Sequence, residues 1–363
     1  MQRSATSVCW RTCCLSHPSS ADICCRIREY ADASPHNAIG EGWFVKATND
    51  DIRFAYRLLL GREPDESGFR NYARMVSTTQ ISVSDVAATF LDSAEFHARQ
   101  ANQNKVTKIE QDGYSIFVSA GDSAIGRSIL ENGAWERHVS EKLKRILLPS
   151  MTFVDIGANI GYFTAMAAHA VGPSGKVVAI EPMDKNAQLI YATCHYNDFN
   201  NVHVLQCGAS DRHAFVPLDT GAGTSNGSLR YDDNKNILPQ FIAQTFALDD
   251  LLPNIDSVDV IKMDIEGFEP HAWKGFEKTI TRCKPRILTE FHPKCLAENG
   301  KYEPISYLEM LFSYARVLTI LEPDGGETTM HNPTTVMNAW REHDRALMEN
   351  GCAHLDIYVA PLL

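Results

Sequence analysis

The spacing of apolar positions changes along this chain and divides it into three stretches. Residues 1–48 show no sustained periodicity, and we expect a poorly ordered leader there. From 49 to 105, apolar residues recur at helical spacing, which predicts a small all-α accessory domain whose first helix is broken at 61–65 by GREPD. From 106 to 363, a short strand pair and an amphipathic helix precede an alternation of strands and helices.

Seven short apolar runs in the third stretch predict strands, with helix-like segments between them. The runs are Thr152–Ile156, Val177–Ile180, Val202–Leu205, Val258–Met263, Arg286–Phe291, Val317–Leu321 and Leu355–Val359. The main helical segments are Tyr162–Ala170, Asn186–Asn197, Pro270–Lys274 and Ile305–Ser313. This alternation predicts an α/β fold with a mostly parallel seven-stranded sheet and helices on both faces. Because ligands bind at the carboxyl ends of such strands, the polar residues after each run are the functional candidates.

The loop after the first run reads VDIGANIGYFT at 154–164. Gly157 and Gly161 lack a Cβ, so the backbone there can approach a ligand, and the next helix begins with free N–H groups. Asp155 can hold a polar ligand or fix the loop. A nicotinamide-binding loop needs G-x-G-x-x-G, but Asn159 replaces the middle glycine that admits a pyrophosphate. The loop therefore favours S-adenosylmethionine, which has cationic groups and no phosphate. The alternative is an ordinary strand-turn-helix with packing glycines.

Acidic residues follow the second and third runs. Glu181 ends the second run 20 residues beyond Gly161, the offset at which an acid accepts hydrogen bonds from a ribose diol. Asp211 follows the third run in GASD, where it can accept from the adenine amine or cap a turn. Both residues are cofactor-binding candidates, and the alternative for Glu181 is a helix-capping acid.

The fourth run leads into IKMDIEGFE, in which three acids surround one glycine. Asp264 falls where the strand opens into the cleft, so it can hold the ligand's amino group or contact the acceptor. Glu266 and Glu269 either line the cleft or cap the next helix. Nothing in the sequence demands a metal at this cluster, and none is predicted.

The fifth run ends in LTEFHP, which supplies two candidates for a general base. Methyl transfer to a hydroxyl requires removal of a proton from a weak acid, so a positioned base helps. We name His292 and Glu290, with Asp264, as catalytic candidates. For His292, a structural hydrogen-bonding role is the alternative.

A polar segment at 219–244, rich in Gly, Asn and Ser, separates the third and fourth runs. Its length suggests a mobile cover or an acceptor-binding segment, and plain surface is the alternative.

The formal net charge is −11, which argues against nucleic-acid binding led by electrostatics. No apolar stretch is long enough for a transmembrane helix, and the start lacks a signal-peptide run. With scattered cysteines in the body of the chain, these features favour a reduced, cytoplasmic enzyme.

Two family resemblances accompany these motifs. The segment YRLLLGREPDESGFRNYARMV with VAATFLDSAEF resembles a small helical domain of unknown function, found in bacterial proteins linked to surfaces and polysaccharides. The later motifs VDIGANIGYFT, AIEP, GASD, LDDLL, IKMDIEGFE and LTEFHP, preceded by NGAWE, resemble the FkbM family of methyltransferases from about 114 to 293, and the final strand DIYVAP also fits.

The second resemblance implies a class I, Rossmann-like fold with S-adenosylmethionine as cofactor and a hydroxyl acceptor. Carried onto this chain, it places the cofactor at Asp155, Gly157, Asn159, Gly161, Glu181 and Asp211, with Asp264 and Glu266 lining the cleft. It does not fix the base.

The first hypothesis is therefore O-methylation of a bacterial sugar or glycan. The alternatives are a non-catalytic docking module that keeps the cofactor site, an O-methyltransferase for a lipid or polyketide-like molecule, and a nicotinamide oxidoreductase. Expected partners are a small-molecule or glycan acceptor and no nucleic acid. The sequence leaves the oligomeric state open.

Overall fold

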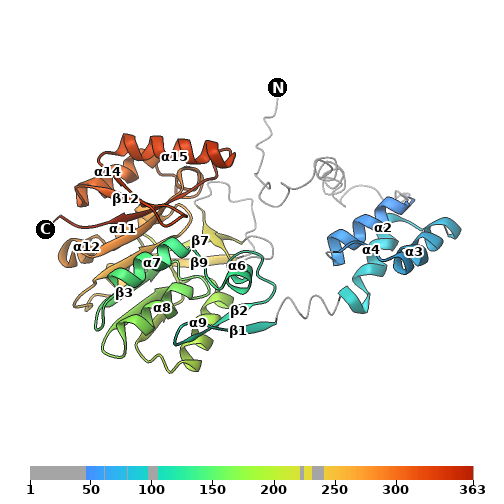
Figure 1. Cartoon of the computed structure of the whole chain (residues 1–363), viewed down its shortest axis with the longest axis horizontal. Helices are drawn as coiled ribbons and strands as arrows, with labels where there is room; N and C mark the ends of the chain where they lie inside the picture. The colour runs from blue at the N-terminus through green and yellow to red at the C-terminus, as the bar shows by residue number, and fades with distance from the viewer. Residues whose placement is uncertain are drawn as a thin grey trace. The chain divides into compact units, whose positions relative to one another are not determined.

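A computed structural model describes residues 46–60, 62–79, 81–96, 105–220, 225–230 and 241–362 (Figure 1). The chain divides into two compact units, residues 1–97 and 98–363. Most of the expected leader lies outside the described residues, and the domain limits at 48 and 105 stay predictions. No helix in the described ranges is long and apolar enough to cross a membrane.

The first unit is a small helical bundle around an aromatic core. Its described elements are α2 (Asn49–Ala55), the π-helix η1 (Tyr56–Leu60), α3 (Glu66–Thr78) and α4 (Val83–Leu91). The rings of Tyr72 and Phe90 stack with centroids 4.5 Å apart. Asp65 caps α3 by accepting from the Gly68 N–H. The predicted helices are confirmed here.

The second unit begins with a hairpin and two helices, followed by the main sheet. The hairpin pairs β1 (Val106–Glu110) with β2 (Ser115–Ser119), and the helices are α6 (Ile125–Asn132) and α7 (Arg137–Ile146). The main sheet has eight strands in the order β13-β12-β14-β11-β10-β3-β4-β5. Their bounds are β3 Thr152–Ile156, β4 Lys176–Ile180, β5 Val202–Leu205, β10 Val260–Met263, β11 Arg286–Phe291, β12 Leu318–Leu321, β13 Glu327–Met330 and β14 Leu355–Val359.

All seven predicted strands belong to this sheet, and the α/β class is confirmed. The expected count of seven is wrong, because β13 pairs antiparallel with β12 and adds an edge strand. From β5 to β11 the pairs are parallel, whereas β14 runs antiparallel to both of its neighbours, β11 and β12. The polar sequence ETTM gives β13 no apolar run, so the pattern could not reveal it.

Helices cover both faces of the sheet (Figure 1). They are α8 (Tyr162–Val171), α9 (Asp184–Tyr196), α10 (Leu248–Leu251), α11 (Glu269–Gly275), α12 (Glu277–Cys283), α13 (Pro293–Glu298), α14 (Pro304–Tyr314) and α15 (Pro333–Leu347).

Successive strand residues face opposite sides of the sheet. Phe153, Val260 and Leu288 join the core that contains α7 and α8. Val154 and Ile261 join the opposite core, which contains α11, α14 and α15.

A second sheet of four strands lies in the stretch where the sequence suggested a long loop. Its order is β6-β9-β7-β8, with β6 at Gly208–Ala209, β7 at Ala214–Thr220, β8 at Gly227–Leu229 and β9 at Phe241–Phe246. Residues 221–224 and 231–240 lie outside the described ranges. Within the polar segment 219–244, residues 219–220, 227–229 and 241–244 belong to strands of this sheet, and the expected role as a cover or acceptor-binding segment stays a prediction.

Candidate active site

The glycine-rich turn after β3 packs its glycines against protein. Gly157 has φ +84°, and a Cβ there would run into the backbone carbonyl of Asp264. Gly161 has φ +86°, and a Cβ there would meet the Ile190 side chain at 2.8 Å. The backbone conformation and this close packing explain the glycines. Gly157 lets the ends of β3 and β10 approach each other, and Gly161 lets the turn pack on α9. The close approach of a ligand to this turn stays a prediction.

Glu181 is held in place by donors from two segments. The Asn159 N–H donates to Oε2 at 2.8 Å, the Met183 N–H to Oε1 at 2.8 Å and the Asn186 amide to Oε1 at 3.3 Å. Burial raises the pKa of Glu181 to about 7, although these donors favour the ionised form. A carboxylate has about four acceptor positions, so one fixed by three donors can still accept from a ligand hydroxyl.

A segment from the second sheet covers this corner. The amides of Asn159 and Asn186 donate to the Ser225 carbonyl at 3.3 and 2.9 Å. The Ser225 hydroxyl in turn donates to Asp122 at 2.8 Å. Ser225 is buried, so the described part of the polar segment is fixed against the glycine turn.

Charged side chains lie near the carboxyl ends of β3 and β10 in the main sheet. Asp155 is 0% exposed, accepts from the Thr164 hydroxyl at 2.6 Å, and lies opposite Lys262 in the β3–β10 register. Its Oδ1 is buried and has no hydrogen-bond partner in the described part of the chain. Burial raises the pKa of Asp155, against the effect of Lys262. Of the two roles suggested by the sequence, these contacts favour fixing the loop.

Asp264 follows β10 and pairs with Lys262, with Nζ 2.7 Å from Oδ2. Burial acts to raise the pKa of Asp264, but the Lys262 ammonium outweighs it, so the pKa lies below its ordinary value. Glu269 accepts from the N–H groups of Ile265 and Gly267, so it fixes the turn that follows Asp264. Glu266 contacts the Cys295 thiol at 3.6 Å.

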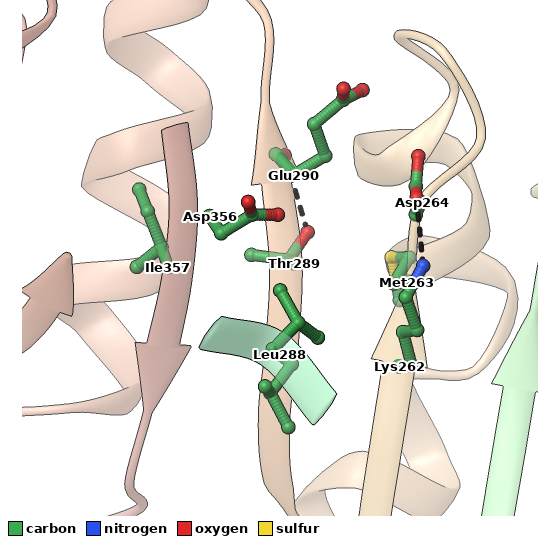
Figure 2. A pocket seen from close by; sticks show the side chains of 9 residues that line it. Lys262, Met263, Asp264, Leu288, Thr289, Glu290, Asp356 and Ile357 are labelled. Carbon is green, nitrogen blue, oxygen red and sulfur yellow. Dashed lines mark hydrogen bonds and ion pairs between the residues drawn. The ribbon is translucent and has the colours of Figure 1, made fainter. Parts of the chain in front are cut away.

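Glu290 and Asp356 face each other across β11 and β14 in direct register. With Lys262 and Asp264 they line a small cavity, and Figure 2 shows the carboxyl groups of Asp356, Glu290 and Asp264 across three neighbouring strands. Glu290 is 8% exposed, and its Oε2 has no hydrogen-bond partner among the described residues. Burial, reinforced by the neighbouring carboxylates, raises the pKa of Glu290 well above its ordinary range.

His292 begins α13, and its side chain caps that helix. The Cys295 N–H donates to Nδ1 at 3.3 Å. Burial lowers the pKa of His292 to about 4, so the ring is neutral at neutral pH. Because Nδ1 is the acceptor in this bond, the ring proton is assigned to Nε2, which then acts as a donor.

Asp211 follows β6, the first strand of the second sheet. Its Oδ2 is 3.6 Å from His271 Nδ1 of α11 and its Oδ1 is 3.4 Å from Arg212. Its contact with adenine stays a prediction.

Four residues of this site were absent from the sequence-based candidates. Lys262 and Asp356 lie inside predicted strands, and a charge within an apolar run was the available signal. His138 contacts Asp356 at 2.6 Å from the first turn of α7. Glu136, just before α7, has a left-handed backbone with φ 38° and a buried Oε2 without a hydrogen-bond partner in the described ranges. Asp356 reaches the site because β14 pairs with β11, and Glu136 and His138 reach it because α7 packs against the sheet.

The described residues contain no group of three or more His, Cys, Asp or Glu side chains that could hold a metal ion. The five cysteines described, Cys194, Cys207, Cys283, Cys295 and Cys352, are free thiols.

Profiles of two known domains match the chain. The methyltransferase FkbM domain matches residues 155–322, and a domain of unknown function, DUF4214, matches residues 46–100. The FkbM match starts at the glycine turn, so NGAWE and α7 precede it. No curated protein matches the chain.

Solved structures of methyltransferases also match. The methyltransferase FkbM from Methylobacillus flagellatus KT is 17% identical with a TM-score of 0.32, and the match covers 76% of this chain and 57% of that one. A SAM-dependent methyltransferase from Aquifex aeolicus is 17% identical with a TM-score of 0.31, covering 70% of this chain and 100% of that one. An O-methyltransferase from Bacillus cereus in complex with SAH is 15% identical with a TM-score of 0.35, covering 62% and 80%.

The chain spans a little over half the length of the Methylobacillus protein. The fold is α/β and class I methyltransferase-like, and the FkbM profile covers the glycine turn, Glu181, Asp264 and Glu290. The chain therefore carries a methyltransferase FkbM domain at residues 155–322, preceded by a DUF4214 domain at residues 46–100.

Proposed function

We propose that this protein uses S-adenosylmethionine to methylate a hydroxyl group of a sugar or glycan, with Glu290 as the general base. When bound, S-adenosylmethionine supplies an electrophilic methyl group on a cationic sulfonium. The observation that carries the proposal is the buried, unpartnered Oε2 of Glu290, a residue that lines the same cavity as Asp264 at the carboxyl ends of β10 and β11.

The residues at these strand ends fit such a cofactor. Glu181 is fixed by three donors and retains acceptor capacity for a ribose diol. Buried carboxyl groups with unpartnered oxygens, Asp155, Glu136 and Glu290, suit a cationic ligand. The Gly157–Gly161 turn, Glu181 and Asp264 would hold the cofactor. The adenine contact of Asp211 belongs to the same proposal.

Three candidate bases differ in their readiness to accept a proton. Asp264 is paired with Lys262, and its pKa is lowered, so it is a weak base. His292 already accepts the Cys295 N–H at Nδ1 and carries its proton at Nε2. Glu290 combines a free buried oxygen with a raised pKa. A general base needs an oxygen that is free to take up the hydroxyl proton, so these properties favour Glu290.

In such a transfer the acceptor oxygen would bond to the methyl carbon as the methyl–sulfur bond breaks and S-adenosylhomocysteine leaves, while Glu290 takes up the hydroxyl proton. Positioning of the acceptor supplies most of the acceleration in a displacement of this kind. The Gly157 turn against Asp264 sets the spacing between the β3 and β10 ends, and the β11–β14 register holds Glu290 opposite Asp356.

The choice of a glycan as acceptor rests on an analogy. The helical domain resembles one found in bacterial proteins linked to surfaces and polysaccharides. A lipid or polyketide-like acceptor and a cofactor-binding docking module are the other candidates. The unpartnered base candidate favours catalysis over docking, because a buried carboxyl without a partner costs stability unless a ligand uses it.

The experiment begins with calorimetric titration of the full chain with S-adenosylmethionine, using the Gly157→Val, Glu181→Ala double variant as control. Binding that the control loses supports the cofactor site, whereas absence of binding contradicts the proposal.

A second step measures transfer from methyl-labelled S-adenosylmethionine to neutral glycans, lipids and small polyketides. Label on glycan hydroxyls supports the proposed acceptor. Label only on a lipid or polyketide contradicts it.

A further inference from the structure

We propose that a surface groove between the start of α7 and the β12–β13 turn binds the acceptor as an uncharged, hydroxyl-rich chain, and that the acidic catalytic cavity beside this groove rejects anionic acceptors. This inference rests on the proposed function and adds the location and charge of the acceptor. The groove has a volume of about 240 Å³. Its charged lining consists of Arg137, His138, Glu141, Arg145, Asp324 and Glu327.

The groove adjoins the candidate catalytic cavity through one pair of side chains. His138 lines the groove, Asp356 lines the cavity that holds Glu290 and Asp264, and their Nε2 and Oδ2 atoms are 2.6 Å apart. Both side chains are mostly buried, at 13% and 12% exposure. An acceptor lying in the groove would therefore extend toward Glu290 past this pair.

The groove lining balances opposite charges and offers both donors and acceptors. Glu327 bridges Lys142 and Arg145 at 2.9 and 2.6 Å. Arg137 is exposed and has no hydrogen bond or ion pair in the described ranges, so its guanidinium is available to a ligand. Guanidinium and carboxylate groups each engage two neighbouring hydroxyls, and a lining of both suits a polyhydroxylated chain.

The catalytic end has an excess of acids. Glu136, Asp264, Glu290 and Asp356 surround Lys262, which is 4% exposed and already paired with Asp264. The free oxygens of Glu136 and Glu290 can accept from hydroxyls, but they would face a phosphate or carboxylate of an acceptor. Of the cationic or imidazole groups described beside them, Lys262 already pairs with Asp264, and His354 lies 3.7 Å from Glu290. Like charges brought together in a buried site oppose binding.

The test uses the full chain loaded with S-adenosylhomocysteine on an array of matched neutral, uronic-acid and phosphorylated glycans. We expect retention of neutral glycans and at least about tenfold weaker retention of their anionic counterparts. Arg137→Ala should weaken retention of the neutral glycans about tenfold. Arg341→Ala, which removes an exposed arginine of α15 outside the groove, should leave it unchanged.

The inference is overturned if anionic glycans bind equally well, if no glycan is retained, or if the two arginine variants behave alike. A parallel titration with S-adenosylmethionine distinguishes failure of the groove from failure of the proposed function. If the wild-type protein does not bind the cofactor, the proposed function itself is refuted. Intact cofactor binding with methyl transfer to some acceptor, but without the array result, would refute only the groove.

Discussion

The carboxylates in the two halves of the sheet's carboxyl edge differ in how many hydrogen bonds they accept. In the β3–β4 half, Glu181 accepts from three donors and the covering Ser225 is fixed by Asn159, Asn186 and Asp122. In the β10–β14 half, Glu290 has a buried oxygen without a partner among the described residues, and Asp356 stands opposite it in register. The β3–β4 half is therefore organised by hydrogen bonds within the protein, whereas the β10–β14 half keeps a carboxylate oxygen that can accept from a ligand.

This difference suggests a division of labour. A site for a fixed cofactor gains from preorganised groups, because little ordering remains to be done when the ligand binds. A proton acceptor must instead keep an oxygen free for the substrate. Changes in the β3–β4 half should therefore affect stability and cofactor affinity, and changes in the β10–β14 half should affect the rate of transfer.

The largest expected effect comes from Gly157→Ala, with Gly133→Ala as the matched control. Both glycines have positive φ, but a Cβ at 157 would overlap the Asp264 carbonyl, whereas a Cβ at 133 would have nothing within 4 Å. We expect Gly157→Ala to lower the free energy of unfolding by about 2–5 kcal/mol, and Gly133→Ala by about 1–2 kcal/mol. Chemical denaturation measures both, and equal losses would show that the β3–β10 approach is unimportant.

Glu290→Gln should slow methyl transfer by about 10²–10⁴-fold, because the amide cannot accept the hydroxyl proton. Cofactor affinity measured by calorimetry should stay within about twofold of wild type. His292→Gln serves as the comparison: it loses the cap of α13, with a cost of about 1 kcal/mol in stability, but keeps most of the rate. A larger rate loss for His292→Gln would transfer the role of base to the histidine.

The wild-type rate should rise with pH through the raised pKa of Glu290, since a protonated carboxyl cannot act as a base.

The free energy of unfolding should fall as the pH rises, because of Glu181. Burial raises its pKa from 4.5 to about 7, so the folded state binds the proton more tightly than the unfolded state.

The Glu181 contribution to stability is therefore complete below pH about 4.5 and is lost as the pH rises toward 7, by up to about 3 kcal/mol. Glu181→Gln cannot titrate and should lack this change. Denaturation of both proteins at pH 5 and pH 8 measures the difference, and parallel pH dependences would contradict the shift.

The smallest effect is expected for Ser225→Ala, which removes the hydroxyl that donates to Asp122. The backbone N–H of Ser225 still donates to the same carboxylate, so the loss should be about 1 kcal/mol, with a modest decrease in cofactor affinity. Ser313→Ala, which removes an exposed hydroxyl on α14, should change stability by less than about 0.5 kcal/mol. Equal effects would mean that the cover contributes nothing.

The strands were predictable because buried strands leave apolar runs, and the glycine turn and Glu181 were predictable because their spacing follows from local backbone geometry. The pattern missed β13, which is polar, and the second sheet, whose short strands lie within a Gly- and Asn-rich stretch. The sequence proposed both Glu290 and His292, since both lie at the carboxyl end of the same strand. The structure distinguishes them, because His292 Nδ1 accepts the Cys295 N–H whereas Glu290 Oε2 is buried without a partner among the described residues.

The succession of elements, the domain families and the residues at the ends of consecutive strands could all be read from the sequence, because each depends on neighbours along the chain. The tertiary structure decided which of those side chains keep a free atom. It also brought Glu136, His138 and Asp356 to the site from segments on either side of the central strands. Strand order and the antiparallel return of β14 place these residues beside Glu290. They follow from packing between distant segments, which no local pattern records.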